Sequence, residues 1–98
     1  MLGTIIGTEE NVVLIKLNVD LDQLPNLVNF HVIMEEADKK IVGEITDVKD
    51  GIAYVNLLGE IINNRFVFGV IRKPAFSSSV MLISKEKIPL VIGIDNYR

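Results

Sequence analysis

Hydrophobic and polar residues alternate in short runs that are separated by polar or glycine-containing turns. Runs of this length, rich in Ile, Val, Leu and Thr, predict β-strands. The expected strands are Leu2–Thr8, Val12–Asn18, Phe30–Glu36, Ile41–Val48, Ile52–Leu58, Phe66–Ile71 and Val80–Ile83, with further extended chain over Ile88–Ile94. Turn signals recur about every ten residues and no run has a convincing helical period, which is typical of an all-β barrel or sandwich.

Four local signals refine this reading. Asp50-Gly51 is the strongest turn, because Gly adopts positive φ without steric cost. Gly43 lies inside a strand and predicts a bulge or a close backbone approach. Pro25, within the irregular stretch Val19–Asn29, predicts a connection or one helical turn, and Pro74 ends strand pairing after the sixth strand. The chain therefore predicts strands joined mostly by short turns.

Composition indicates one folded domain that leaves part of its apolar surface exposed. The chain has 98 residues, of which 49% are hydrophobic and 23% charged. This length allows a single core, and the balance is that of a folded protein rather than a disordered one. The mean hydropathy of +0.38 is high for a domain so small. Some of the apolar surface is therefore expected to bind a partner.

Charge and cysteine content exclude several classes of function. The net charge of −3 disfavours non-specific binding to nucleic acid by the chain alone. The chain has no cysteine and a single histidine, His31, which excludes disulfides, thiolate metal sites and histidine-rich metal sites. It has no apolar stretch long enough for a membrane span, and Met1–Thr8 does not resemble a signal peptide. A cytoplasmic location without membrane contact is expected.

No residue constellation predicts catalysis. Glu35 and Glu36 are neighbours on a strand, so their side chains point to opposite faces and do not converge on one substrate. No motif places an acid or a serine near His31, and Ser77–Ser79 are expected in a flexible loop. No phosphate-binding loop with a Gly-Lys-Ser/Thr ending is present. We therefore predict no catalytic, cofactor-binding or metal-binding residue, and a chain that is not itself an enzyme.

An alternative is a free-standing β-barrel that binds single-stranded nucleic acid. Small barrels of this kind stack bases on aromatic rings of one face. Phe66 and Phe68 are two residues apart and share a face, and Arg72 and Lys73 follow shortly after. The acidic balance and the 6% aromatic content count against this reading.

The order of features resembles the HAS-barrel, the N-terminal β-barrel of HerA-like hexameric ATPases. The resemblance covers the chain from Leu2 to about Gly93, and its motifs are moderately specific. The segments that carry it are Leu2-Gly3-Thr4-Ile5-Ile6-Gly7, Phe30-His31-Val32-Ile33-Met34, Ile41-Val42-Gly43-Glu44-Ile45-Thr46-Asp47-Val48 and Val80-Met81-Leu82-Ile83.

The resemblance implies a small closed β-barrel of six to seven short strands over residues 1–94, with residues 95–98 beginning a linker to a motor domain outside this chain. It implies a non-catalytic role in ring assembly and in docking an effector, such as a NurA-like nuclease or a sirtuin-type NAD hydrolase, in DNA processing or anti-phage defence. ATP, Mg²⁺ and DNA would bind only to the full-length assembly, which the resemblance implies is a hexamer. The expected interface residues are Phe66, Phe68, Arg72, Val80 and Leu82.

Overall fold

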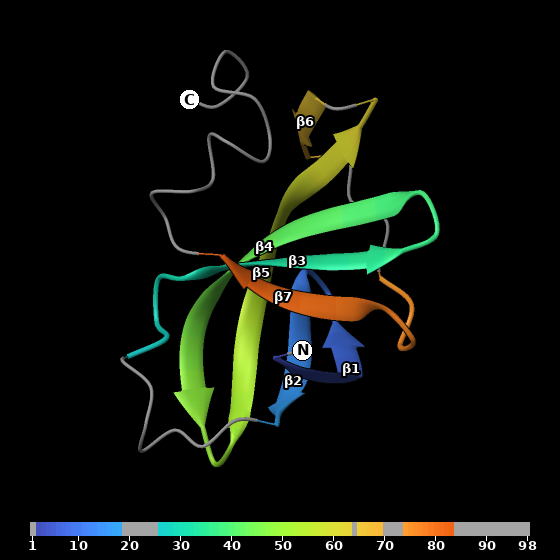
Figure 1. Ribbon diagram of the computed structural model, residues 1–98. Coiled ribbons are helices and arrows are strands. Elements are labelled where there is room, and N and C mark those ends of the chain that lie inside the picture. Colours follow the sequence, from blue (N-terminus) through green and yellow to red (C-terminus); the bar gives the residue numbers. More distant parts are fainter. Residues whose placement is uncertain (1, 19–25, 64, 70–73, 84–98) are drawn as a thin grey trace.

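The protein consists of β-strands connected by turns and loops. The computed structural model describes residues 2–18, 26–63, 65–69 and 74–83. Its strands are β1 (Gly3–Glu9), β2 (Val12–Leu17), β3 (His31–Glu36), β4 (Lys39–Lys49), β5 (Ile52–Ile62), β6 (Arg65–Phe68) and β7 (Ser79–Ile83) (Figure 1). The described residues form no helix, so none of them belongs to a helix that could cross a membrane. The all-β prediction is confirmed, while Ile88–Ile94, Ile71 and the expected linker at residues 95–98 lie outside the described residues.

All seven strands belong to one antiparallel sheet. The strand order is β1-β2-β5-β4-β3-β7, and β6 pairs with β5 outside this path. The first half of β5 pairs with β2 and its last residues, Gly59–Ile62, pair with β6. The long strands β4 and β5 therefore form the centre of the sheet, and β1, β6 and β7 each have one ladder partner among the described strands (Figure 1).

The sheet curls into a half-barrel that stays open, which corrects the expectation of a closed barrel. Closure requires a continuous ladder of hydrogen bonds between the first and last strands. Here the two edges meet where the Leu2 amide donates to the Val80 carbonyl oxygen at 3.0 Å, and β1 and β7 form no ladder. We call this contact the seam.

Glycine at position 43 permits the bend of β4. The register between β4 and β5 shifts between Val42 and Gly43, which confirms the predicted irregularity. A Cβ atom at Gly43 would overlap the Val55 side chain and lie 3.0 Å from the Asn56 carbonyl oxygen. Neighbouring strands can therefore approach closely here, as the curvature of the sheet requires.

Two-residue turns close the hairpins on both sides of β4. Asp50 and Gly51 adopt φ angles of +54° and +77°, so the predicted Asp-Gly turn is confirmed. These left-handed conformations match the twist of the strands that they join. Ala37, in the turn between β3 and β4, also has a positive φ of +52°, although its Cβ atom disfavours this region.

Apolar side chains pack on both faces of the sheet. The main core contains Val32, Met34 and Ile41 among its members. A second cluster consists of Ile33, Val42, Ile61 and Phe66. Because consecutive side chains of a strand point to opposite faces, Val32 and Ile33 belong to different clusters. Part of β3, β4 and β5 is thus covered on both sides.

Candidate functional site

Phe66 and Phe68 lie on the same face of β6, as predicted. Their ring centroids are 4.4 Å apart and the rings are nearly perpendicular, at 83°. This edge-to-face arrangement is a favourable geometry for aromatic pairs. Phe66 is only 7% exposed and belongs to the second cluster, whereas Phe68 is 52% exposed. The pair thus presents one aromatic ring to solvent on a buried support.

Gly59 makes room for this aromatic pair. It lies directly opposite Phe68 in the ladder between β5 and β6. A Cβ atom at Gly59 would approach Phe66 Cζ to 2.9 Å and would overlap the Val67 carbonyl oxygen. A glycine is therefore needed for the Phe66 ring to lie against β5 and for Phe68 to project from it.

The residues expected on β7 are placed differently. The Val80 side chain is 0% exposed and belongs to the main core, and Leu82 packs partly buried against that core. The residue between them, Met81, is 50% exposed. The side chain of Val80 is therefore part of the main core and not of the surface of the described chain. An interface role for this residue stays a prediction. Arg72 lies outside the described residues.

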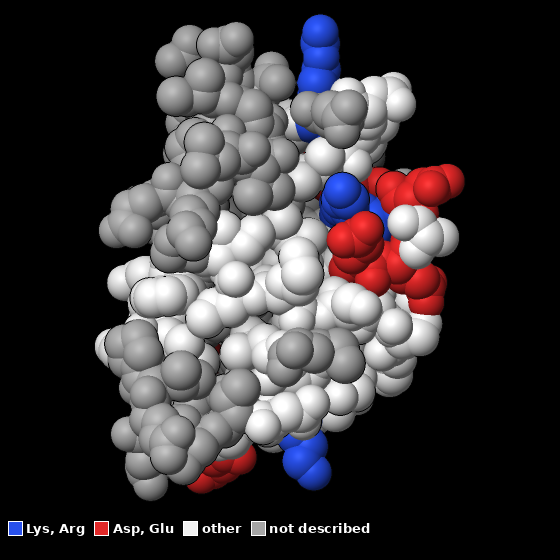
Figure 2. All heavy atoms as spheres, in the orientation of Figure 1, with Lys and Arg blue, Asp and Glu red and all other residues white. Residues whose placement is uncertain are grey.

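Among the described residues, four of the five exposed large apolar side chains lie on or beside the edge strands. Ile6 lies on β1, Phe68 on β6 and Met81 on β7, while Phe76 lies in the loop before β7. The fifth, Ile62, is the last residue of the central strand β5. Charged residues commonly protect sheet edges from pairing with other chains. The edge strand β7 contains none, and in the face shown in Figure 2 the charged side chains lie toward the margins. These edges form the candidate docking surface.

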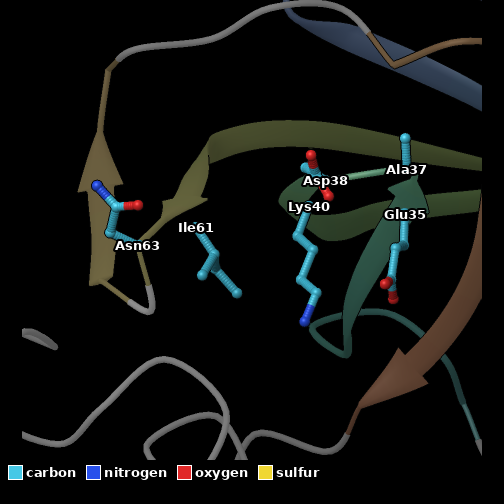
Figure 3. Close-up of a pocket in the computed structure, with 6 residues that line it drawn as sticks. All are labelled: Glu35, Ala37, Asp38, Lys40, Ile61 and Asn63. Atoms are coloured by element: carbon cyan, nitrogen blue, oxygen red, sulfur yellow. The ribbon is translucent and has the colours of Figure 1, made fainter.

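A hollow of about 340 Å³ lies between two turns, near the β3–β4 hairpin and the end of β5 (Figure 3). Its described lining residues are Glu35, Ala37, Asp38, Lys40, Ile61 and Asn63. From the sequence, Glu35 was expected only to point to the opposite face from Glu36. No local pattern predicts the hollow, because Ile61 and Asn63 join it only through the register between β4 and β5.

The other polar residues considered for chemistry are separated by the fold. Glu35 is opposite Lys40, whereas Glu36 is opposite Lys39 and accepts a hydrogen bond from the Ser77 hydroxyl. The two carboxylates thus point to opposite faces, as predicted. His31 is buried in β3.

Two polar positions differ from what the sequence suggested. The serine run is only partly a loop, since the Ser78 amide donates to the Ala75 carbonyl oxygen at 3.0 Å and Ser79 begins β7. Glu60, which the sequence analysis did not single out, is buried in β5 and takes part in a polar interaction. Its position within an otherwise apolar run gave no signal of a function.

No family model matches the chain, and no curated protein matches it significantly.

Proposed function

We propose that this chain is a non-catalytic assembly and partner-docking barrel, of the kind that precedes the motor in HerA-like ATP-driven DNA translocases. The observation that carries the proposal is the position of exposed apolar side chains, Phe68 and Met81 above all, on edge strands. Unpaired strand edges with apolar side chains are surfaces on which a second chain can add.

The preferred partner at these edges is another copy of the same chain. The edges lie on different sides of the sheet path, since β1 and β7 are its two ends and β6 is a branch on β5. Contact between unlike edges of neighbouring copies is heterologous, and such contacts form closed rings when the rotation between copies closes. An effector protein would then dock on the assembled ring, and ATP hydrolysis would belong to the motor domain.

Sedimentation velocity over a range of micromolar concentrations tests self-association of the chain. We expect the average mass to rise with concentration, because association follows mass action. Met81→Lys and Phe68→Lys place a charge in the contact and should weaken association at least about tenfold. Asn56→Lys adds the same charge at an exposed position of the central strand β5 and serves as the control. A strict monomer at the highest concentration would refute self-assembly through the barrel.

Single-stranded nucleic-acid binding remains the second candidate, supported by the exposed Phe68 ring on β6. Base stacking on one ring contributes roughly 1–3 kcal/mol. Fluorescence anisotropy with a labelled thymidine oligonucleotide at low salt separates the two proposals. Binding that decreases with salt and with Phe68→Ala would favour this function, and absence of binding at low salt would eliminate it.

A further inference from the structure

Three side chains of the hollow form one row across neighbouring strands. Glu35 on β3 is directly opposite Lys40 on β4, and Lys40 is directly opposite Ile61 on β5. Figure 3 shows these three side chains extending in the same direction, while Ala37, Asp38 and Asn63 lie at the two turns. An acid, a base and an apolar side chain therefore line one side of the hollow in a fixed order.

The two charged side chains of this row, Glu35 and Lys40, do not form an ion pair with each other. Opposite charges at directly opposite positions of antiparallel strands commonly attract and pair. Yet neither Glu35 nor Lys40 has an ion-pair or hydrogen-bonding partner for its charged group in the structure, as far as it describes the chain. Both residues are partly buried and line the hollow. A carboxylate and an ammonium group thus remain available side by side.

We propose that this hollow binds a free α-amino acid with an apolar side chain. Such a zwitterion carries an ammonium group for Glu35 and a carboxylate for Lys40, and its side chain would contact Ile61. A simple cation or anion would leave one of the two protein charges without a counterpart. The volume of about 340 Å³ is at the lower end of small-molecule sites, which suits a ligand of this size rather than a nucleotide.

The row itself supplies the groups that would contact the ligand. Figure 3 shows the side chains of Asp38 and Asn63 at the two turns, directed away from the charged ends of Glu35 and Lys40. The site is independent of the proposed assembly, because neither Phe68 nor Met81 lines it. Amino-acid binding in the hollow and self-association through the edge strands can therefore be tested, and can fail, independently of each other.

Two-dimensional NMR of the ¹⁵N-labelled chain, titrated with L-leucine, tests the proposal. We expect saturable shift changes centred on the amides of Glu35 to Lys40 and of Ile61. Two analogues serve as ligand controls: isoamylamine lacks the carboxylate, and 4-methylpentanoate lacks the ammonium group. Each should bind several-fold more weakly than leucine, because each loses one of the two charge-assisted contacts.

Charge-neutralising variants locate the site. Glu35→Gln and Lys40→Gln should each weaken leucine binding roughly three- to tenfold, in line with solvent-accessible charged contacts. Lys49→Gln, at the far end of β4, makes the same change outside the hollow and should leave binding unaltered. The proposal is overturned if leucine produces no saturable shifts up to tens of millimolar, or if the three compounds bind equally. The ligand comparison uses the unmodified chain, so it decides the question even if a variant fails to fold.

Discussion

The backbone of Leu2 is hydrogen-bonded to that of Val80, across 78 positions of the chain. The Leu2 amide donates to the Val80 carbonyl oxygen at 3.0 Å, and the Leu2 carbonyl accepts from the Asn18 amide at 2.9 Å. Both side chains belong to the main core. This seam connects the two ends of the curled sheet without a ladder between β1 and β7.

The seam predicts energetic coupling between its two side chains. Leu2→Ala and Val80→Ala should each lower the free energy of unfolding by roughly 2–4 kcal/mol, since each removes buried methyl groups. Because loss of either residue loosens the same contact, the double variant should cost less than the sum, by about 0.5 kcal/mol or more. Urea unfolding of the unmodified chain, the two single variants and the double variant measures this coupling free energy. Strictly additive losses of stability would show that the seam does not couple the two edges of the sheet.

The alternation of burial along β7 predicts opposite behaviour at adjacent positions. Val80→Ala leaves a cavity in the core and should destabilise the fold by about 2 kcal/mol. Met81→Ala truncates a half-exposed side chain and should change the free energy of unfolding by less than about 0.5 kcal/mol. Thermal and urea unfolding distinguish them, and a larger cost at Met81 would contradict the register of β7.

Two glycines offer a matched test of the close approach beneath Phe66. Gly59→Ala should destabilise the fold by roughly 1–3 kcal/mol, because the new methyl group meets the Val67 backbone and the Phe66 ring. Gly7→Ala is the control, since nothing lies within 4 Å of a Cβ atom at that strand position. Its effect should stay within about 0.5 kcal/mol. Equal effects of the two substitutions in urea unfolding would refute the packing of β6 on β5.

The left-handed conformation of Ala37 predicts a stabilising substitution. Ala37→Gly removes a steric cost of about 1–2 kcal/mol from the folded state. Glycine also gives the unfolded chain more conformational entropy, which offsets part of this gain. The free energy of unfolding should therefore rise by up to about 1 kcal/mol. Ala53→Gly, at a buried strand position, should instead destabilise the protein. Calorimetry measures both changes in melting temperature, and a loss of stability in Ala37→Gly would contradict the positive φ.

Local sequence patterns were sufficient to locate the strands. They were less sufficient to predict where each strand ends and which of its side chains face the core. Alternation located all seven strands, and Asp50-Gly51 and Gly43 marked a turn and a bulge correctly. The strand expected to end at Leu58 continues to Ile62, because Gly59 and Glu60 look like a break in sequence but are held by pairing with β6. The buried position of Val80 and the exposed position of Met81 depend on which face of β7 meets the core, and composition does not contain that information.

Features that combine distant segments could not be predicted. Whether the barrel closes depends on hydrogen bonds between β1 and β7, which belong to opposite ends of the strand order. The hollow depends on β4 and β5 aligning Lys40 with Ile61. Neither the contact between β1 and β7 nor the alignment of Lys40 with Ile61 can be predicted from a short segment of sequence. By contrast, Phe66 and Phe68 share a face because they are two residues apart on one strand.

The seam also determines how the molecule would respond to mechanical load. Tension that separates β1 from β7 acts first on the contact between Leu2 and Val80, which has no parallel row of bonds to share the force. The β4–β5 hairpin, with its long ladder and tight Asp50-Gly51 turn, would bear load only after the edges have parted. The edge strands β1 and β7 are thus expected to separate under load while the β4–β5 ladder at the centre of the sheet stays paired.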